Sequence, residues 1–293
     1  MPSVTVGNVE LAYEEIGTGQ PLLLIMGIGA NLAMWHDDWC GQLAARGFRV
    51  IRFDNRDVGK SSQLDALGVP KLQPMFLRAA VGKPLPPPYS ITNMAGDAAG
   101  LLAALGIRRA HVVGMSMGGM IAQQMAVHYR GAMASVCSIM STTGSRRFLP
   151  RPSALRALLQ PPRSSAIEDV AANTVRVFKI IGGKPARVED EQDLWTVARA
   201  AAARGGSPAG YVRQLAAVLA EHNRTTMLQR VHIAGLVVHG EQDPLIPIAA
   251  GRATAKALHH STFLPVAQMG HDLPRRHWPQ IIDAICSNAA RGE

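Results

Sequence analysis

The decisive stretch of this sequence reads Ala110-His111-Val112-Val113-Gly114-Met115-Ser116-Met117-Gly118-Gly119-Met120. Its apolar first half predicts a buried strand, and residues 121–126 continue the second half as a helix. A serine flanked by Gly114 and Gly118 is typical of a nucleophile elbow, a sharp strand-to-helix turn that exposes the serine hydroxyl. The flanking residues must be small because larger side chains would collide with the strand and helix. A plain Gly-Ser turn has the same letters, so the interpretation depends on catalytic partners elsewhere.

Strand and helix patterns alternate on both sides of this turn. Residues 4–16 alternate as an antiparallel hairpin would, with its turn at Gly7-Asn8. Residues 21–26 are continuously apolar, as a strand covered on both faces must be. Further strands are expected at 48–53, 134–140, 235–240 and 262–266, and helices at 38–46, 91–105 and 279–290. This alternation predicts an α/β fold with a mostly parallel sheet flanked by helices.

Two stretches break the alternation. Residues 64–88 are expected to be irregular, because prolines at 84, 86, 87 and 88 enforce an extended path. Residues 144–232 contain about four amphipathic helices and no convincing strand; Ser165 to Glu168 is expected to form a capping box, and Ser207-Pro208 to open another helix. We therefore expect a core of residues 1–143 and 233–293, with residues 144–232 inserted as a helical cap that lies over the strand ends as a lid.

Composition narrows the class of protein. The 293 residues are 47% hydrophobic, enough for one large buried core. The net charge of +9 comes from scattered basic residues, so a solvated basic surface is expected rather than a nucleic-acid site. No apolar run is long enough to span a membrane, and the first residues carry no secretion pattern. Three distant cysteines, Cys40, Cys137 and Cys286, fit reduced thiols, so a cytoplasmic protein is expected.

A serine hydroxyl needs a base to take its proton and a carboxylate to orient that base. After an elbow of this kind the expected chain order is serine, acid, histidine. Asp243 follows an apolar strand and precedes Pro244; Glu241 is a near rival, and residues 141–147 after the preceding strand contain no acid. His271 follows the last strand, whereas the other histidines lie within strands or at the wrong ends of them. The expected triad is Ser116, His271 and Asp243.

Two backbone N–H groups are expected to bind the oxyanion that forms during attack. One belongs to Met117, the residue after the serine, and the other to the glycine-rich loop after residues 21–26, with Ile28 favoured over Gly27. Gly27, Trp35 and Met115, with Met117, are expected to line the substrate pocket, although core packing explains the last three equally well. This chemistry requires no metal and no cofactor.

Taken together, these residues resemble those of the α/β-hydrolase superfamily over nearly the whole chain, and among them the aclacinomycin methylesterase-type hydrolases. The resemblance implies an eight-stranded sheet, an inserted helical cap and the triad named above. Many relatives have His-Gly where this chain has Met26-Gly27, which leaves the position of the second oxyanion donor open by one residue. The resemblance rests on Leu24-Ile25-Met26-Gly27, Arg52-Phe53-Asp54-Asn55-Arg56-Asp57-Val58-Gly59-Lys60-Ser61, His111-Val112-Val113-Gly114-Met115-Ser116-Met117-Gly118 and Met269-Gly270-His271-Asp272-Leu273-Pro274.

The leading hypothesis is a carboxylic ester hydrolase that acts on a small to medium apolar ester through an acyl-enzyme. Ser116 excludes the dehalogenase and epoxide-hydrolase mechanisms, which need an aspartate at the elbow. A carbon-carbon bond hydrolase and a cofactor-free peroxidase could use the same triad, and a hydrolase-like receptor could bind small molecules without turnover. The sequence leaves open both a monomer and a homo-oligomer.

Overall fold

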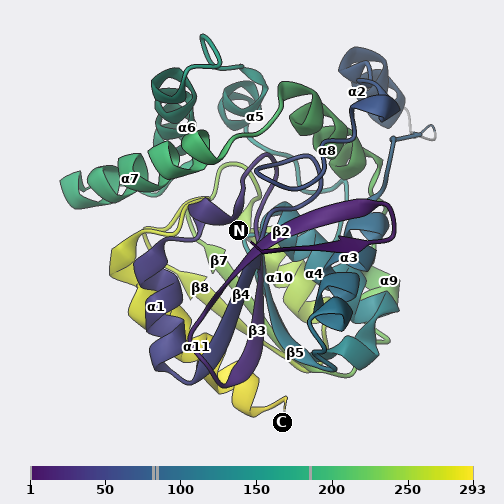
Figure 1. Ribbon diagram of the computed structural model, residues 1–293, viewed down its shortest axis with the longest axis vertical. Coiled ribbons are helices and arrows are strands. Elements are labelled where there is room, and N and C mark those ends of the chain that lie inside the picture. The colour runs from purple at the N-terminus through teal and green to yellow at the C-terminus, as the bar shows by residue number, and fades with distance from the viewer. Residues whose placement is uncertain (1, 81–82, 84–85, 185–186, 293) are drawn as a thin grey trace.

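An eight-stranded sheet runs through the centre of the protein (Figure 1). The computed structural model describes residues 2–80, 83, 86–184 and 187–292. The strand order is β1-β2-β4-β3-β5-β6-β7-β8; β2 pairs antiparallel with β1 and β4, and the remaining pairs are parallel. The expected fold class is confirmed. The strands are β1 (Ser3–Val6), β2 (Val9–Ile16), β3 (Gln20–Ile25), β4 (Phe48–Phe53), β5 (Ala110–Met115), β6 (Met133–Ile139), β7 (Ala234–Gly240) and β8 (Ser261–Val266).

Helices cover both faces of this sheet. One face is covered by α1 (Asp37–Ala45) and α11 (Trp278–Ala290), and the other by α3 (Ile91–Ala104), α4 (Met117–His128) and α10 (Ile248–Ala257) (Figure 1). Alternate side chains of each strand therefore enter different cores: Leu23 and Ile25 pack with α3 and α4, whereas Leu22 and Leu24 pack with α1 and α11.

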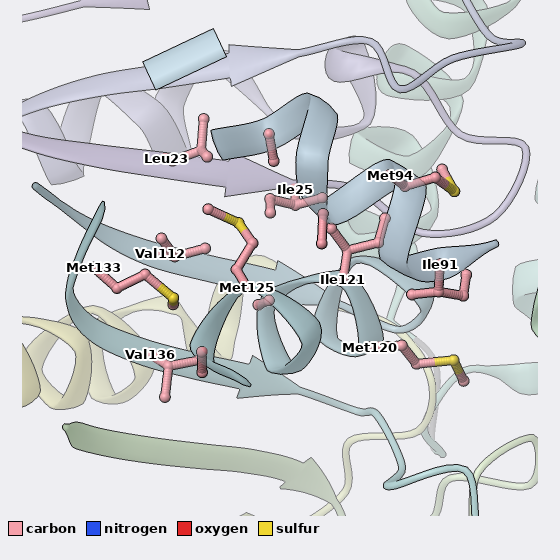
Figure 2. Close-up of a cluster of buried hydrophobic side chains, with 14 of the residues drawn as sticks. Leu23, Ile25, Ile91, Met94, Val112, Met120, Ile121, Met125, Met133 and Val136 are labelled. Atoms are coloured by element: carbon pink, nitrogen blue, oxygen red, sulfur yellow. The ribbon is translucent and has the colours of Figure 1, made fainter. Parts of the chain in front are cut away.

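Methionine fills much of the α3/α4 core. Met94, Met120, Met125 and Met133 lie among branched aliphatic side chains in this layer (Figure 2). Aromatic residues make up only 5% of the chain, and the flexible thioether side chain can fill the irregular gaps that remain between aliphatic residues.

The helices between β6 and β7 lie beyond one end of the sheet. These are α5 (Pro152–Leu159), α6 (Ile167–Ile181), α7 (Val188–Arg204) and α8 (Pro208–Ala220); a short α9 (Thr225–Leu228) returns the chain to the sheet beside α4 and α10 (Figure 1). Ser207 caps α8 by accepting a hydrogen bond from the Gly210 N–H, as the sequence predicted. No helix of the described residues is long and apolar enough to cross a membrane.

Two local predictions were wrong, and one helix was not predicted. The stretch expected to be irregular contains α2 (Leu72–Ala80), which packs against α8, so a tertiary contact stabilises it; Pro84 lies outside the described residues. Ser165 does not cap α6: the N-cap is Ala166, and the neighbouring Ser164 hydroxyl instead accepts from the Ala166 N–H and donates to Asp169. Helix α10, between β7 and β8, was absent from the expected elements.

Two buried ion pairs attach α7 and α8 to the loop after β4. Arg204 at the end of α7 contacts Asp54 at 2.8 Å, and Arg213 of α8 forms two hydrogen bonds, of 2.7 and 2.8 Å, with Asp57. Neither side chain of the second pair is exposed to solvent. Burial alone would raise the pKa of Asp57, but hydrogen bonds from Arg213, the Leu64 N–H and Tyr89 outweigh it and hold the pKa below its ordinary value.

We predict that Arg213→Met lowers the free energy of unfolding by about 3–5 kcal/mol, because Asp57 is left as a buried charge without its partner. Arg199→Met is the matched control on α7, since Arg199 pairs with Glu168 at the surface. The control should cost no more than about 1 kcal/mol. Urea denaturation measures the free energy of unfolding of both variants. Similar decreases in the two variants would contradict the assignment of Arg213 as a buried anchor.

Candidate active site

The serine at the elbow occupies a strained backbone position. Ser116 has φ of 57° and ψ of −118°, and its N–H donates to the Ile139 carbonyl of β6 at 2.9 Å. The flanking glycines make this turn possible: a Cβ at Gly114 would lie 2.1 Å from the Gly118 oxygen, and a Cβ at Gly118 would lie 2.0 Å from the Ile25 oxygen. The backbone segments are therefore in direct contact, and Ser116 is held at the end of β5 beside the loop that follows β3.

A continuous chain of hydrogen bonds joins the three residues of the expected triad. His271 Nε2 lies 3.0 Å from Ser116 Oγ, and His271 Nδ1 lies 2.7 Å from Asp243 Oδ2. Because a carboxylate can only accept, Nδ1 carries the proton in the neutral ring, which leaves Nε2 free to accept the serine proton. This geometry is the one that general-base activation of a serine requires.

Asp243 is held in place by its own loop. Its Oδ1 accepts hydrogen bonds from the N–H groups of Leu245 and Ile246, both at 2.8 Å. His239 lies beneath it, with Nε2 2.8 Å from the Ile246 carbonyl and 3.6 Å from Asp243 Oδ2. Burial lowers the pKa of His239, so the ring is neutral and donates to that carbonyl. The sequence placed His239 within a strand but did not reveal this contact with the Asp243 loop.

The His271 loop is held by the end of α6. The His271 N–H donates to the Ile181 carbonyl at 2.7 Å, and the next residue, Asp272, accepts from the N–H groups of Gly183 and Gly270. Burial raises the pKa of Asp272, and those two N–H groups and His271 offset part of this effect. The His271 loop and the end of α6 approach closely, since a Cβ at Gly270 would lie 2.5 Å from the Ile181 oxygen.

The glycine-rich loop after β3 passes beside the serine. A Cβ at Gly27 would lie 3.1 Å from the Ser116 Cβ and 3.6 Å from Ser116 Oγ. The Gly29 N–H is committed to Gln214 Oε1 at 2.7 Å, whereas the N–H groups of Ile28 and Met117 have no acceptor among the residues the structure describes. The two expected oxyanion donors are therefore not engaged by another described residue.

A cavity of about 760 Å³ opens above Ser116 and His271. Its wall is mainly apolar, and much of it comes from helices of the 144–232 segment. Gly27 and Met115, two of the residues expected in the pocket wall, line it, and so does Ile28. The contributions of the helical segment include Leu158, Phe178, Val197 and Tyr211, which no motif in the sequence singled out.

Two residues expected in the pocket wall lie in the core instead. Trp35 is fully buried against α1, with its ring stacked on Trp39 at 6.4 Å, and Trp39 is the one of the pair that reaches the cavity. Met117 points from the first turn of α4 into the core between α4 and the sheet. Helical and 3₁₀ geometry decides which side of the chain faces the cavity, and the residue types alone could not show it. Among the described residues, no group of three or more His, Cys, Asp or Glu side chains could hold a metal ion.

The sheet order, the helices on both faces and the serine at the turn after β5 define an α/β hydrolase. A model of the α/β hydrolase fold matches residues 20–283, and the chain belongs to this family. It is 27% identical to the rhodomycin D methylesterase DnrP of Streptomyces peucetius, over 98% of each chain, which confirms the resemblance to methylesterase-type hydrolases. It is also 27% identical to a non-heme haloperoxidase of Rhodococcus erythropolis, over 91% of this chain and 90% of that one. The structure is similar to the enol-lactonase of Burkholderia xenovorans, with a TM-score of 0.73, 20% identity and coverage of 99% and 100%.

We predict that an alkyl fluorophosphonate labels Ser116 and no other serine of the cavity. His271→Gln should slow labelling by at least about 100-fold, because the ring nitrogen that lies 3.0 Å from the serine hydroxyl and could accept its proton is lost. Ser165→Ala is the control, since Ser165 lines the cavity without a histidine partner, and it should label at the normal rate. Peptide mass mapping identifies the labelled residue. Continued labelling of a Ser116→Ala variant would contradict this prediction.

Proposed function

We propose that this protein is a carboxylic ester hydrolase that works through an acyl-enzyme on Ser116. The observation that carries the proposal is the unbroken hydrogen-bonded chain from Asp243 through His271 to the serine hydroxyl. Ser116 Oγ attacks the ester carbonyl carbon while His271 Nε2 takes its proton. Asp243 keeps the ring in the correct tautomer and stabilises the imidazolium that forms.

The later steps use the same groups in reverse roles. The tetrahedral oxyanion accepts hydrogen bonds from the N–H groups of Met117 and Ile28, and the intermediate collapses as His271 gives its proton to the leaving alcohol. A water molecule then attacks the acyl-enzyme with His271 as base, which releases the carboxylic acid and restores Ser116. The atoms balance with no metal, cofactor or redox partner.

The proposed substrate is an apolar ester of small to medium size. The cavity supports this, because its wall is mainly apolar and it opens directly onto Ser116. Several of the charged groups along its edge are already paired with each other, Lys179 with Glu191 and Arg275 with Asp193. A neutral molecule is therefore favoured over a charged one. In this proposal residues 144–232 act as a cap over a core of residues 1–143 and 233–293.

A second candidate activity is peroxidation without a cofactor, which the similarity to a non-heme haloperoxidase favours. In that reaction hydrogen peroxide, rather than water, attacks the acyl-enzyme, so that a peracid is released and Ser116 is restored. The two activities share every step before the acyl-enzyme is resolved. Turnover measured with and without hydrogen peroxide, with the peracid detected directly, separates them.

We predict that Ser116→Ala abolishes hydrolysis of short p-nitrophenyl esters, with a loss of at least about 10³-fold in kcat, because no acyl-enzyme can form. The variant should keep its circular dichroism spectrum and its melting temperature, because the change removes one oxygen atom. A panel of p-nitrophenyl esters of graded acyl length, with methyl esters of polycyclic aromatic acids, then defines the preferred substrate. Undiminished turnover in the alanine variant would overturn the proposal.

We predict that Gly27→Ala lowers kcat about tenfold. The added methyl would lie 3.1 Å from the Ser116 Cβ, so the loop must shift by a few tenths of an ångström, and reaction rates are sensitive to such displacements. Gly41→Ala on α1 is the matched control, because a Cβ there meets nothing within 4 Å. The control should hydrolyse the ester at the normal rate and unfold at an equal or higher temperature. A kcat for Gly27→Ala within twofold of the wild type would refute this prediction.

A further inference from the structure

Gln214 lies on α8, far from the serine in sequence, yet its side chain is bonded to the loop beside the serine. It is fully buried, and both ends of its amide are used. Oε1 accepts from the Gly29 N–H at 2.7 Å, and Nε2 donates to the Arg56 carbonyl at 2.8 Å. A neutral amide can accept from one backbone group and donate to another, which neither a carboxylate nor an ammonium group can do.

The rest of α8 fixes the position from which Gln214 reaches the loop. A Cβ at Gly210 would lie 2.4 Å from the Asp57 carbonyl oxygen, so the helix is in backbone contact with the core. Arg213 binds Asp57 on the same side. Tyr211 packs against the loop itself, because a Cβ at Gly29 would lie 2.4 Å from its ring. Helix α8 is therefore seated rigidly, and Gln214 transmits that position to Gly29.

The backbone of the loop explains what this contact does. The Ala30 N–H donates to the Gly27 carbonyl in a tight turn, and Gly29 has a φ of 65°. The peptide that carries the Gly29 N–H and the peptide that carries the Ile28 N–H are joined through the φ and ψ of Ile28 alone. When Gln214 holds the peptide that carries the Gly29 N–H, it limits the orientation of the peptide that carries the Ile28 N–H.

We propose that Gln214 is a positioning residue that orients the Ile28 N–H toward the developing oxyanion. This inference rests on the proposed ester hydrolysis and adds to it a residue of the helical segment. Gln214 touches neither the substrate nor Ser116; it acts through Gly29. The consequence is that the oxyanion donor loop is set by a helix of the segment that also forms the cavity wall.

The test compares an oxygen ester with the matching thionoester, in which the carbonyl oxygen is replaced by sulfur. Sulfur is larger and a weak hydrogen-bond acceptor, so a well-placed oxyanion donor favours the oxygen ester. Gln214→Met keeps the length and burial of the side chain but removes both hydrogen bonds. We predict a fall in kcat of about 10–100-fold with KM within threefold, and a fall of at least fivefold in the ester-to-thionoester ratio of kcat/KM.

Gln124→Met is the matched control, because Gln124 is another buried glutamine, which donates to Glu221 from α4. It should leave the ester-to-thionoester ratio unchanged. If Gln214→Met does not fold, Gln214→Asn carries the test: it keeps the amide but shortens its reach, and the ratio should again fall.

The outcomes separate this inference from the proposed function. A lowered ester-to-thionoester ratio supports the positioning role. A general folding defect would reduce the active fraction and so lower the apparent kcat/KM for both substrates in proportion, which leaves their ratio unchanged. An unchanged ratio in a folded Gln214 variant, while Ser116→Ala is inactive, overturns the positioning role alone. Full ester turnover in Ser116→Ala overturns the proposed function and this inference with it.

Discussion

Close approach of the chain at three glycines is the constraint on which the site depends. At Gly114 and Gly118 a side chain would place its Cβ about 2 Å from a backbone oxygen, and at Gly27 a Cβ would press on Ser116 itself. These contacts bring β3, β5 and the first turn of α4 closer than side chains allow, which sets the serine beside the loop after β3. The positive φ of Ser116 costs on the order of 1–3 kcal/mol, and it persists because the packed strand and helix leave the chain no other path.

The helices of residues 144–232 support the loops around the serine, each through a different element. The Arg151 N–H at the start of α5 donates to the Pro244 carbonyl, next to Asp243. The end of α6 accepts from the His271 N–H, and Gln214 of α8 holds Gly29. The buried apolar cluster between α6 and α7 is small, so hydrogen bonds and the buried ion pairs to Asp54 and Asp57 carry much of the attachment.

The strands and the three residues of the expected triad could be predicted from local patterns in the sequence. The apolar runs gave the strands, and the order of serine, acid and histidine gave three residues that lie in hydrogen-bonding contact. Each of these residues follows a strand, and parallel strands end at the same edge of the sheet, so the sequence order already implied proximity. The Gly29 N–H is already bonded to Gln214, but this contact does not bear on the choice between Ile28 and Gly27 as the second oxyanion donor, which stays a prediction.

The remaining features depend on contacts between distant segments. Nothing near Gln214 in the sequence indicates that it bonds to a loop 185 residues away. The rings of Trp35 and Trp39 are stacked on each other, yet only Trp39 lines the cavity, and the residue type alone could not show which of the two would do so. Helix α2 has an amphipathic sequence, but the prolines that follow it obscured the signal, and its packing against α8 decided its structure.

The placement of residues along α8 links the cavity wall to the loops beside Ser116. Tyr211 and Val212 line the cavity, whereas Arg213 and Gln214 face the core loops, so a single helical turn carries both tasks. A substitution that reshapes the wall at Tyr211 also changes the packing against Gly29, because its ring is in contact with that residue. By contrast, Val177 and Phe178 of α6 line the cavity one turn before the contact between Ile181 and His271. Changes to the cavity wall made on that part of α6 should therefore disturb Ser116, His271 and the loop after β3 less than changes made on α8.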